Sequence, residues 1–242
     1  MHLILAKDYD ALSEKTATLM IDFIKTTPNA TVCLTSGDTP NGVYRALVKR
    51  IKEENLNIDN CFFVGLDEWV GLDRFDDGSC GSSVFREFIA PLGIPINQYH
   101  FFDGKAENLA LECQKMDAII AAKGGIDLML VGLGTNGHIG LNEPGYSWKL
   151  RSHVSDLEEV TKTVGQKYFK NSTILSQGIT LGLQYFQDAK LAILIANGPN
   201  KAEAVKTAIT AEASEDFPAT IVQTLGNAIV VVDEAAARGL RD

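Results

Sequence analysis

The sequence has no hydrophobic run long enough to cross a bilayer, and its N-terminus lacks the basic-then-apolar pattern of a secretory signal. It is also poor in cysteine: Cys33, Cys61, Cys80 and Cys113 lie far apart and form no CxxC pair. Two of them sit in apolar runs, which is typical of reduced core residues. These absences favour a protein of the reducing cytoplasm.

Positive charge is in short supply as well. The chain has 22 lysines and arginines against 31 acidic residues, a formal net charge of −9. This balance argues against a surface for nucleic acid or an anionic membrane, although it leaves room for a local basic pocket that binds a phosphate. The histidines are few and scattered, with no second one at ligand spacing from His138, so the pattern does not indicate a metal site.

What the chain does contain is an alternation of two apolar patterns. With 242 residues, 45% of them hydrophobic, its length and composition suit one α/β domain over residues 1–242. Short β-branched runs predict buried strands at residues 31–35, 61–66, 126–133, 191–196 and 228–232. Longer periodic stretches predict helices at residues 9–25, 41–54, 107–123 and 201–209. We therefore expect a mostly parallel, twisted, Rossmann-like sheet with helices on both faces.

Polar residues follow four of the predicted strands. Because ligands of such sheets bind at the carboxyl ends of the strands, these positions are where a site is expected. Further along the chain, residues 71–83 are rich in glycine and small polar residues. They predict either a mobile flap over a site or a plain surface connection.

Two of the four segments have features of an anion site. Ser36-Gly37-Asp38-Thr39-Pro40 joins a strand to a helix, so its backbone N–H groups and hydroxyls can hold an anion; it also fits an ordinary helix N-cap with proline at the first position. The carboxylate of Asp38 has to point away from any anion. Lys201 starts a helix, against the macrodipole, which indicates either an anionic ligand or a lysine bent back to solvent.

The other two segments carry groups that can transfer protons. Asp67 and Glu68 follow a strand, where an acidic pair supplies either a general base or a cap for a helix or turn. Residues 134–144 place His138 among glycines, Asn136 and Glu143. A histidine exchanges protons near neutral pH, and an adjacent carboxylate fixes its tautomer, so this segment predicts a functional site.

In this order, the four segments resemble the glucosamine-6-phosphate deaminase/isomerase family over essentially the whole chain. Residues 136–144 (Asn-Gly-His-Ile-Gly-Leu-Asn-Glu-Pro) are close to the family signature. Residues 66–70, Cys80 and residues 178–183 are similar to the galactosamine-6-phosphate branch.

The resemblance implies an isomerising deaminase of hexosamine 6-phosphates that needs no cofactor. Asp67 would move a proton between C2 and C1 of the opened sugar, and His138 would assist ring opening, oriented by Glu143 and Asn136. The residues implied for the phosphate group are Ser36, Gly37, Asp38, Thr39, Lys167 and Lys201.

Three positions differ from the pattern that the family resemblance implies. Asn136 stands where many members have aspartate, Asp38 where a small residue is common, and Lys167 where long-chain members have arginine. A lysine replaces a bidentate fork by a point charge. Basic residues after the signature are also arranged differently from those of allosteric members. We expect an unregulated enzyme, monomeric or a weak homo-oligomer, whose partner is a small sugar phosphate.

Two alternatives remain. One is 6-phosphogluconolactonase, whose reaction needs no proton shuttle between C1 and C2; Glu143 and Trp69 favour the deaminase over it. The other is a non-catalytic sugar-phosphate sensor, against which Asp67, His138 and Glu143 are evidence.

Overall fold

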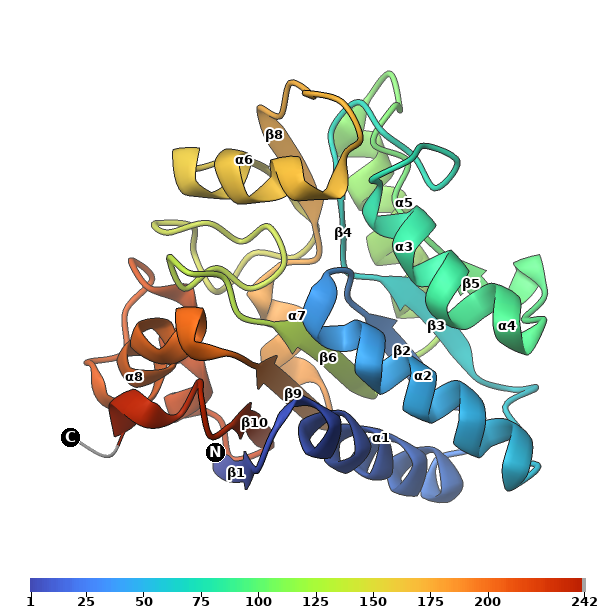
Figure 1. Cartoon of the computed structure of the whole chain (residues 1–242). Coiled ribbons are helices and arrows are strands. Elements are labelled where there is room, and N and C mark those ends of the chain that lie inside the picture. Colours follow the sequence, from blue (N-terminus) through green and yellow to red (C-terminus); the bar gives the residue numbers. More distant parts are fainter. Residues whose placement is uncertain (241–242) are drawn as a thin grey trace.

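Ten strands in the described part of the chain, residues 1–240, form two sheets in this computed structural model (Figure 1). The larger sheet has the strand order β1-β10-β9-β6-β2-β3-β5, and each neighbouring pair is parallel. Its strands are β1 (His2–Ala6), β2 (Thr31–Leu34), β3 (Phe62–Gly65), β5 (Tyr99–His100), β6 (Leu128–Gly132), β9 (Leu191–Ala196) and β10 (Ala228–Asp233). The predicted α/β fold with a mostly parallel sheet is confirmed.

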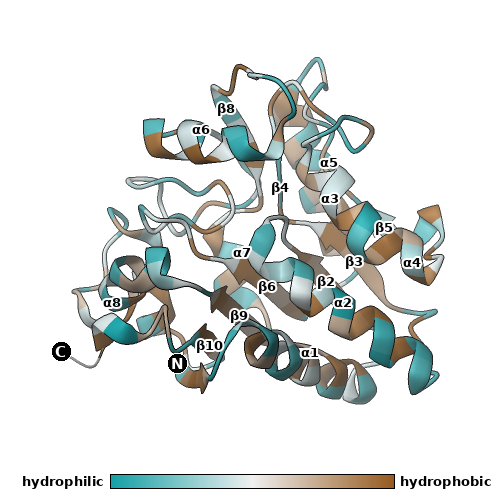
Figure 2. Ribbon diagram, in the orientation of Figure 1, coloured by the Kyte–Doolittle hydropathy of each residue, from teal (hydrophilic) through white to brown (hydrophobic). Residues whose placement is uncertain are grey.

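Alternate residues of the central strands face two hydrophobic cores, one on each side of the large sheet. Val32 and Leu34 of β2 belong to one core, and Cys33 belongs to the other. The first core is covered by α1 (Tyr9–Thr26) and α2 (Asp38–Glu53). The second is covered by α5 (Leu109–Ala122), α7 (Leu183–Asp188), α8 (Ala202–Thr210) and the 3₁₀ helix η5 (Pro218–Thr224). Burial on both faces explains why the strands are almost continuously apolar, as the brown strands of Figure 2 show.

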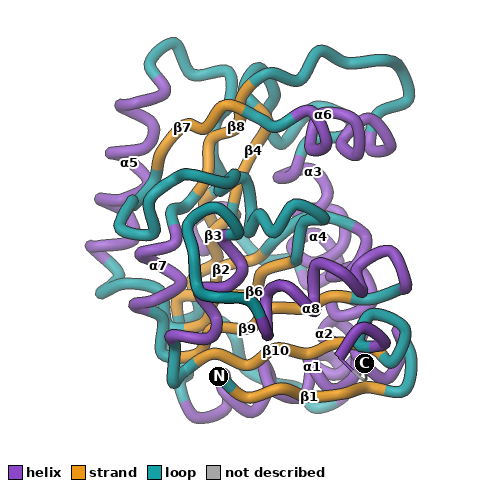
Figure 3. The backbone as a smooth tube through the Cα atoms, turned by 90° about the vertical axis from the view of Figure 1, so that its left-hand side faces the viewer, coloured by secondary structure: helices purple, strands orange, loops and turns teal. Residues whose placement is uncertain are grey.

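A small antiparallel sheet, in the order β4-β8-β7, lies at the top of the view in Figures 1 and 3. Its strands are β4 (Asp67–Trp69), β7 (His153–Asp156) and β8 (Gln177–Thr180). The chain passes from β3 into β4 through the single residue Leu66. The Leu66 N–H donates to the Leu34 carbonyl, while the Leu66 carbonyl accepts from the N–H of Leu181. Leu66 therefore bonds to segments that belong to both sheets.

Short helices and helical turns complete the structure. They are α3 (Cys80–Val84), the π-helical turn η1 (Phe85–Ile89), α4 (Ala90–Leu92), α6 (Glu159–Gly165), and the 3₁₀ turns η2 (Ile96–Gln98), η3 (Gln166–Tyr168), η4 (Pro199–Lys201) and η6 (Arg238–Leu240). A third hydrophobic cluster, which includes Trp69, Cys80 and Leu141, lies in this region, and Tyr168 of η3 packs against it. No helix within residues 1–240 is both long and apolar enough to span a membrane.

The predicted elements are present, with differences at their ends and some omissions. Each of the five predicted strands coincides with an observed one, and α1, α5 and α8 match predicted helices. The helix predicted at residues 41–54 instead begins at Asp38, which brings its first turn into the candidate site. The sequence did not predict β1, β5, the small sheet, or the short helices α3, α6 and α7. All four cysteines are free and buried, including the two in apolar runs that were predicted to be reduced core residues.

Candidate active site

A cavity of about 270 Å³ opens at the carboxyl ends of β2, β6 and β9 and beside the start of β4. From β2 the sheet grows toward β3 and β5 on one side, and from β6 toward β9 and β10 on the other. Such a reversal of strand order leaves a crevice, which is where open parallel sheets bind ligands. Each of the four polar segments predicted from the sequence lines this cavity. The fold therefore brings together residues that are more than 160 positions apart, from Ser36 to Lys201.

The loop after β2 enters α2 through Gly37, whose φ of 114° lies in the region that favours glycine. Helix α2 begins at Asp38, so Pro40 is its third residue, and no side chain of residues 1–240 caps it. The alternative of an ordinary side-chain N-cap with proline at the first position is therefore wrong. The first N–H groups of a helix have no intrahelical partner, so this uncapped end can bind an anion.

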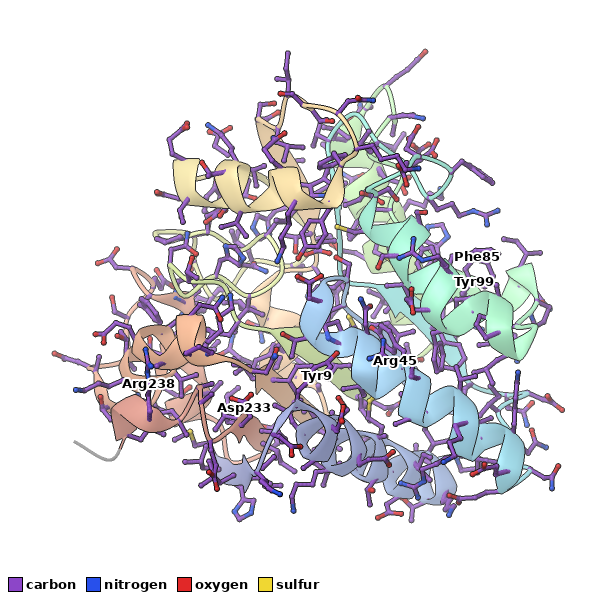
Figure 4. All side chains as sticks on the ribbon, viewed as in Figure 1. Tyr9, Arg45, Phe85, Tyr99, Asp233 and Arg238 are labelled. Carbon is purple, nitrogen blue, oxygen red and sulfur yellow. The ribbon has the colours of Figure 1, made fainter. Side chains whose placement is uncertain are left out.

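Two contacts fix the first turn of α2. The side chain of Tyr9, the first residue of α1 (Figure 4), donates to the Asp38 carbonyl at 2.9 Å and accepts from the Gly42 N–H at 2.7 Å. The Thr39 hydroxyl donates to Asn197 Oδ1 at 2.6 Å, which links the loops that follow β2 and β9. The Thr39 proton is thus already used within the protein, whereas Ser36 lines the cavity nearby.

The two lysines at this end of the cavity have different surroundings. Lys167 comes from η3, and its Nζ lies 2.6 Å from Asp38 Oδ2. Burial lowers the pKa of Lys167, but the hydrogen bond and charge of Asp38 outweigh it and the pKa is raised. Lys201 has no carboxylate of residues 1–240 within 4 Å. Burial, with the nearby charge of Lys167, lowers the pKa of Lys201 to about 8, so this ammonium group is available to an anionic ligand.

Glu68 is fully engaged in holding the backbone. Its carboxylate accepts from the N–H groups of Trp69, Cys80 and Gly81 and from the Ser79 hydroxyl, at 2.8 to 3.0 Å. Burial raises its pKa, and these bonds favour the charged form. Glu68 therefore fixes the start of α3 and fits the cap interpretation of the acidic pair.

Asp67 lines the cavity and is 8% exposed. Its Oδ1 has no hydrogen-bond partner among the described residues. Burial, together with the charge of Glu68, raises the pKa of Asp67 to about 7. A carboxyl group that gains and loses its proton near neutral pH is suited to general acid–base chemistry. Asp67 thus fits the other interpretation of the acidic pair, a general base.

His138 is held by groups from two segments. Its Nδ1 lies 3.1 Å from Thr161 Oγ1 of α6 and 3.5 Å from Glu143 Oε2. Because Nδ1 has these partners, Nε2 is the ring nitrogen left for a ligand. A side chain at Gly134 would overlap the imidazole, since its Cβ would lie 2.3 Å from His138 Cδ2. The ring therefore packs directly on the backbone of the loop after β6.

Glu143 is 1% exposed and lies behind the imidazole rather than in the cavity lining. Asn136 also lies outside the lining, and its Nδ2 donates to Glu143 Oε2 at 2.7 Å. Burial raises the pKa of Glu143, but His138, followed by Thr161 and Asn136, outweighs it and lowers the pKa below the usual value. Asn136 and Glu143 therefore act on His138 from behind and do not line the space for a ligand.

Comparison with known proteins identifies the family. Residues 6–231 match the model of the family described as glucosamine-6-phosphate isomerases/6-phosphogluconolactonase. The chain belongs to this family. Within it, the chain is 35% identical over 240 residues to a glucosamine-6-phosphate deaminase of Bacillus velezensis, covering 99% of this chain and 100% of the relative. It is 36% identical over 242 residues to one of Clostridium perfringens strain ATCC 13124, covering both chains fully.

Solved structures agree with this assignment. The structure of a monomeric glucosamine-6-phosphate deaminase superimposes with a TM-score of 0.95 at 34% identity, covering 99% of this chain and 100% of that one. The 6-phosphogluconolactonase of Trypanosoma brucei has a TM-score of 0.75 at 18% identity, with 99% and 98% covered, and shares the fold. The relatives named here at 34 to 36% identity are glucosamine-6-phosphate deaminases, so they give no support to the galactosamine branch.

Helix α6 and η3 supply cavity residues that sequence analysis missed. Thr161, Val164 and Tyr168 line the cavity together with Lys167, which only the family resemblance had indicated. Thr161 is buried against His138. A seven-residue helix with few apolar positions gives too short a periodic signal to predict, and a lone threonine carries no motif.

Residues 71–83, which were predicted to form either a mobile flap over a site or a surface connection, do not cover the cavity. Of this segment only Cys80, at the start of α3, lines the cavity. Residues 71–79 form a loop, in which Asp73 and Asp76 bind Lys105. The structure therefore agrees with a surface connection, and the element that covers the cavity is α6 with η3.

Proposed function

We propose that this chain is an aldose–ketose isomerase and deaminase of hexosamine 6-phosphates, with glucosamine-6-phosphate as a substrate. The observation that carries the proposal is the presence of a buried carboxyl group, Asp67, and a carboxylate-backed imidazole, His138, in one cavity that also contains Lys201. The distribution of charge matches a ligand with an anionic end and a proton-exchanging end. The product is the ketohexose 6-phosphate plus ammonia.

In the proposed reaction, His138 Nε2 assists the proton exchange that opens the ring, with Glu143 stabilising the charged imidazole. Asp67 then takes the proton from C2 while O1 is protonated, which gives an enolamine. Asp67 returns a proton to C1 as the nitrogen loses one, and the C2 imine forms. Water adds to C2 and ammonia leaves, so the overall change is addition of one water and loss of one ammonia.

The phosphate group is proposed to bind at the other end of the cavity. The backbone N–H groups at the start of α2, the Ser36 hydroxyl and Lys201 form this end, and Lys167 lies beside them. A charge-assisted hydrogen bond to phosphate is the strongest interaction that these groups can offer. We expect the side chain of Asp38 to contribute nothing favourable there.

Ammonia release tests the proposal directly. The protein is incubated separately with glucosamine-6-phosphate, galactosamine-6-phosphate and 6-phosphogluconolactone, and both ammonia and acid are measured, with Asp67→Asn as the matched inactive control. We expect ammonia from at least one amino sugar. Rapid acid production from the lactone with no ammonia would instead identify a lactonase.

The ratio of the two ammonia rates decides the configuration at C4. The resemblance of residues 66–70 and 178–183 to the galactosamine branch favours galactosamine-6-phosphate, whereas the relatives' names favour glucosamine-6-phosphate. We further propose that the chain is monomeric, as the solved relative is described. Sedimentation of the wild-type protein tests that state.

A further inference from the structure

Asp38 places a negative charge at the end of the cavity proposed for the phosphate group. Its side chain is 69% exposed, and it lines the same cavity as Lys167 and Lys201. A fixed carboxylate repels a phosphate dianion at this range. The carboxylate therefore works against the ligand that the lysines and the helix end attract.

The partner of Asp38 is one of those lysines. Asp38 Oδ2 accepts from Lys167 Nζ at 2.6 Å, and the pair joins the first turn of α2 to the segment that covers the cavity. While this pair is closed, the charge of Lys167 is neutralised. Lys201, with no carboxylate of residues 1–240 within 4 Å, then remains as an unneutralised ammonium group of the cavity.

We propose that Asp38 is an internal competitor of the phosphate group: it pairs with Lys167 and lowers the affinity of the site for phosphate esters. The inference rests on the proposed function in naming the ester as ligand. The competition itself applies to any phosphate dianion that reaches the lysines. Asp38 thus sets the strength with which this enzyme holds its substrate.

Removal of the charge should tighten binding. The pair is solvent-exposed, so water and salt screen its interactions, and we expect a gain in phosphate affinity of about five- to twentyfold at low salt. Exposed ion pairs contribute little to folding, so the variants are expected to fold normally. Asn and Ser are both well accepted at helix starts.

The experiment compares Asp38→Asn and Asp38→Ser with the wild-type protein. Titration calorimetry measures the Kd of inorganic phosphate at low salt, and steady-state kinetics measures the KM of glucosamine-6-phosphate. Asp77→Asn is the matched control, because Asp77 forms a similar exposed pair with Lys170 at 2.9 Å. This control changes the net charge equally and releases a neighbouring part of the chain, but Asp77 does not line the cavity.

We expect both Asp38 variants to bind phosphate more tightly and Asp77→Asn to stay within about twofold of wild type. Unchanged or weaker binding by the Asp38 variants would overturn the inference. So would an equal gain in Asp77→Asn, since net charge would then be the cause. A wild-type protein that releases no ammonia while Asp38→Asn still gains phosphate affinity refutes the proposed function alone. Normal ammonia release with an unmoved phosphate Kd refutes the competition alone.

Discussion

The two ends of the cavity differ in how far their charged groups are exposed to solvent. At one end stand Lys167, Asp38 and the first turn of α2, whose charges are half-exposed and whose ligand-binding groups are largely backbone. At the other end, Asp67 and Glu143 are buried and His138 is fixed by neighbours from two segments. At the exposed end, a single substitution can change the affinity for an anion, because water screens the interactions among the other charges. At the buried end, each charged group depends on several neighbours at once, because a buried charge without a partner costs free energy.

The largest effect should come from the buried end. Asp67→Asn removes the proposed proton shuttle, and kcat should fall by about 10³-fold, the range of general acid–base catalysis. In the wild type, kcat/KM should decline as the pH falls below about 7, because Asp67 with a pKa of about 7 becomes protonated and cannot take the C2 proton. The pH profile of ammonia release measures both effects.

Glu68→Gln is the control for this prediction. Glu68 holds backbone groups rather than lining the cavity, so its loss should lower the melting temperature. Because the charge of Glu68 helps to raise the pKa of Asp67, the acid limb of the profile should persist in this variant but move to lower pH. Near-normal turnover in Asp67→Asn would show that the base lies elsewhere.

The exposed end should respond in affinity. Lys201→Met removes an ammonium group, and the KM should rise by about 30-fold, the value of one charge-assisted hydrogen bond. The wild-type KM should also rise above about pH 8, where Lys201 loses its proton in the free protein. Lys149→Met, an exposed lysine outside the cavity lining, serves as control and should leave the KM unchanged. A KM that is unmoved in Lys201→Met would separate this lysine from the phosphate group.

The buried carboxylate of Asp67 should also lower the free energy of unfolding. Asp67 has a pKa of about 7 when folded, against 3.8 for an ordinary aspartate carboxyl group in water, so between these pH values the folded state binds a proton that the unfolded state has lost. Stability contributed by the protonated form is present below about pH 4 and lost as the pH rises toward 7. At pH 8, Asp67→Asn should therefore be more stable than wild type by as much as about 4 kcal/mol. Thermal melts at pH 5 and pH 8 test this, and an equal difference at both would contradict it.

The smallest effect should be that of Thr161, which reaches the imidazole from α6. Thr161→Val keeps the shape and removes the hydroxyl, so kcat should fall by about five- to tenfold with little change in KM, the loss of one hydrogen bond. Thr161→Ser retains a hydroxyl and should recover most of the activity. The pH dependence of kcat should differ between Thr161→Val and wild type but not between Thr161→Ser and wild type. Equal losses in both variants would indicate a packing role.

The same difference in burial determines which parts of the structure could be predicted from the sequence. The strands at the cavity floor are buried on both faces, so runs such as residues 191–196 were predictable, and the polar residues that follow them mark the site. The fold is accordingly well predicted. β1 was missed because an apolar run as short as residues 3–6 does not by itself distinguish a strand from part of a helix. β4 was missed because three residues give no period.

The contacts between segments were not predictable. The choice between Asp67 and Glu68 depends on where α3 places its N–H groups, which local sequence does not specify. The contact of Thr161 with His138 joins residues 23 positions apart through a helix of seven residues. That Asp38 binds Lys167, across 129 positions, follows only from the packing of η3 over α2. The catalytic and phosphate-binding roles remain predictions for the experiments above.

Leu66 fixes the backbone position of Asp67, the proposed base. Since this residue bonds to Leu34 on one side and to Leu181 on the other, Asp67 inherits its position from two sheets at once. We therefore expect the backbone of Asp67 to stay in place while the substrate changes shape. In the proposed reaction, we expect the sugar chain to rotate so that C1 and C2 come in turn within reach of Asp67. The accuracy of the proposed reaction would then depend on how the two ends of the ligand are held, and not on movement of the base.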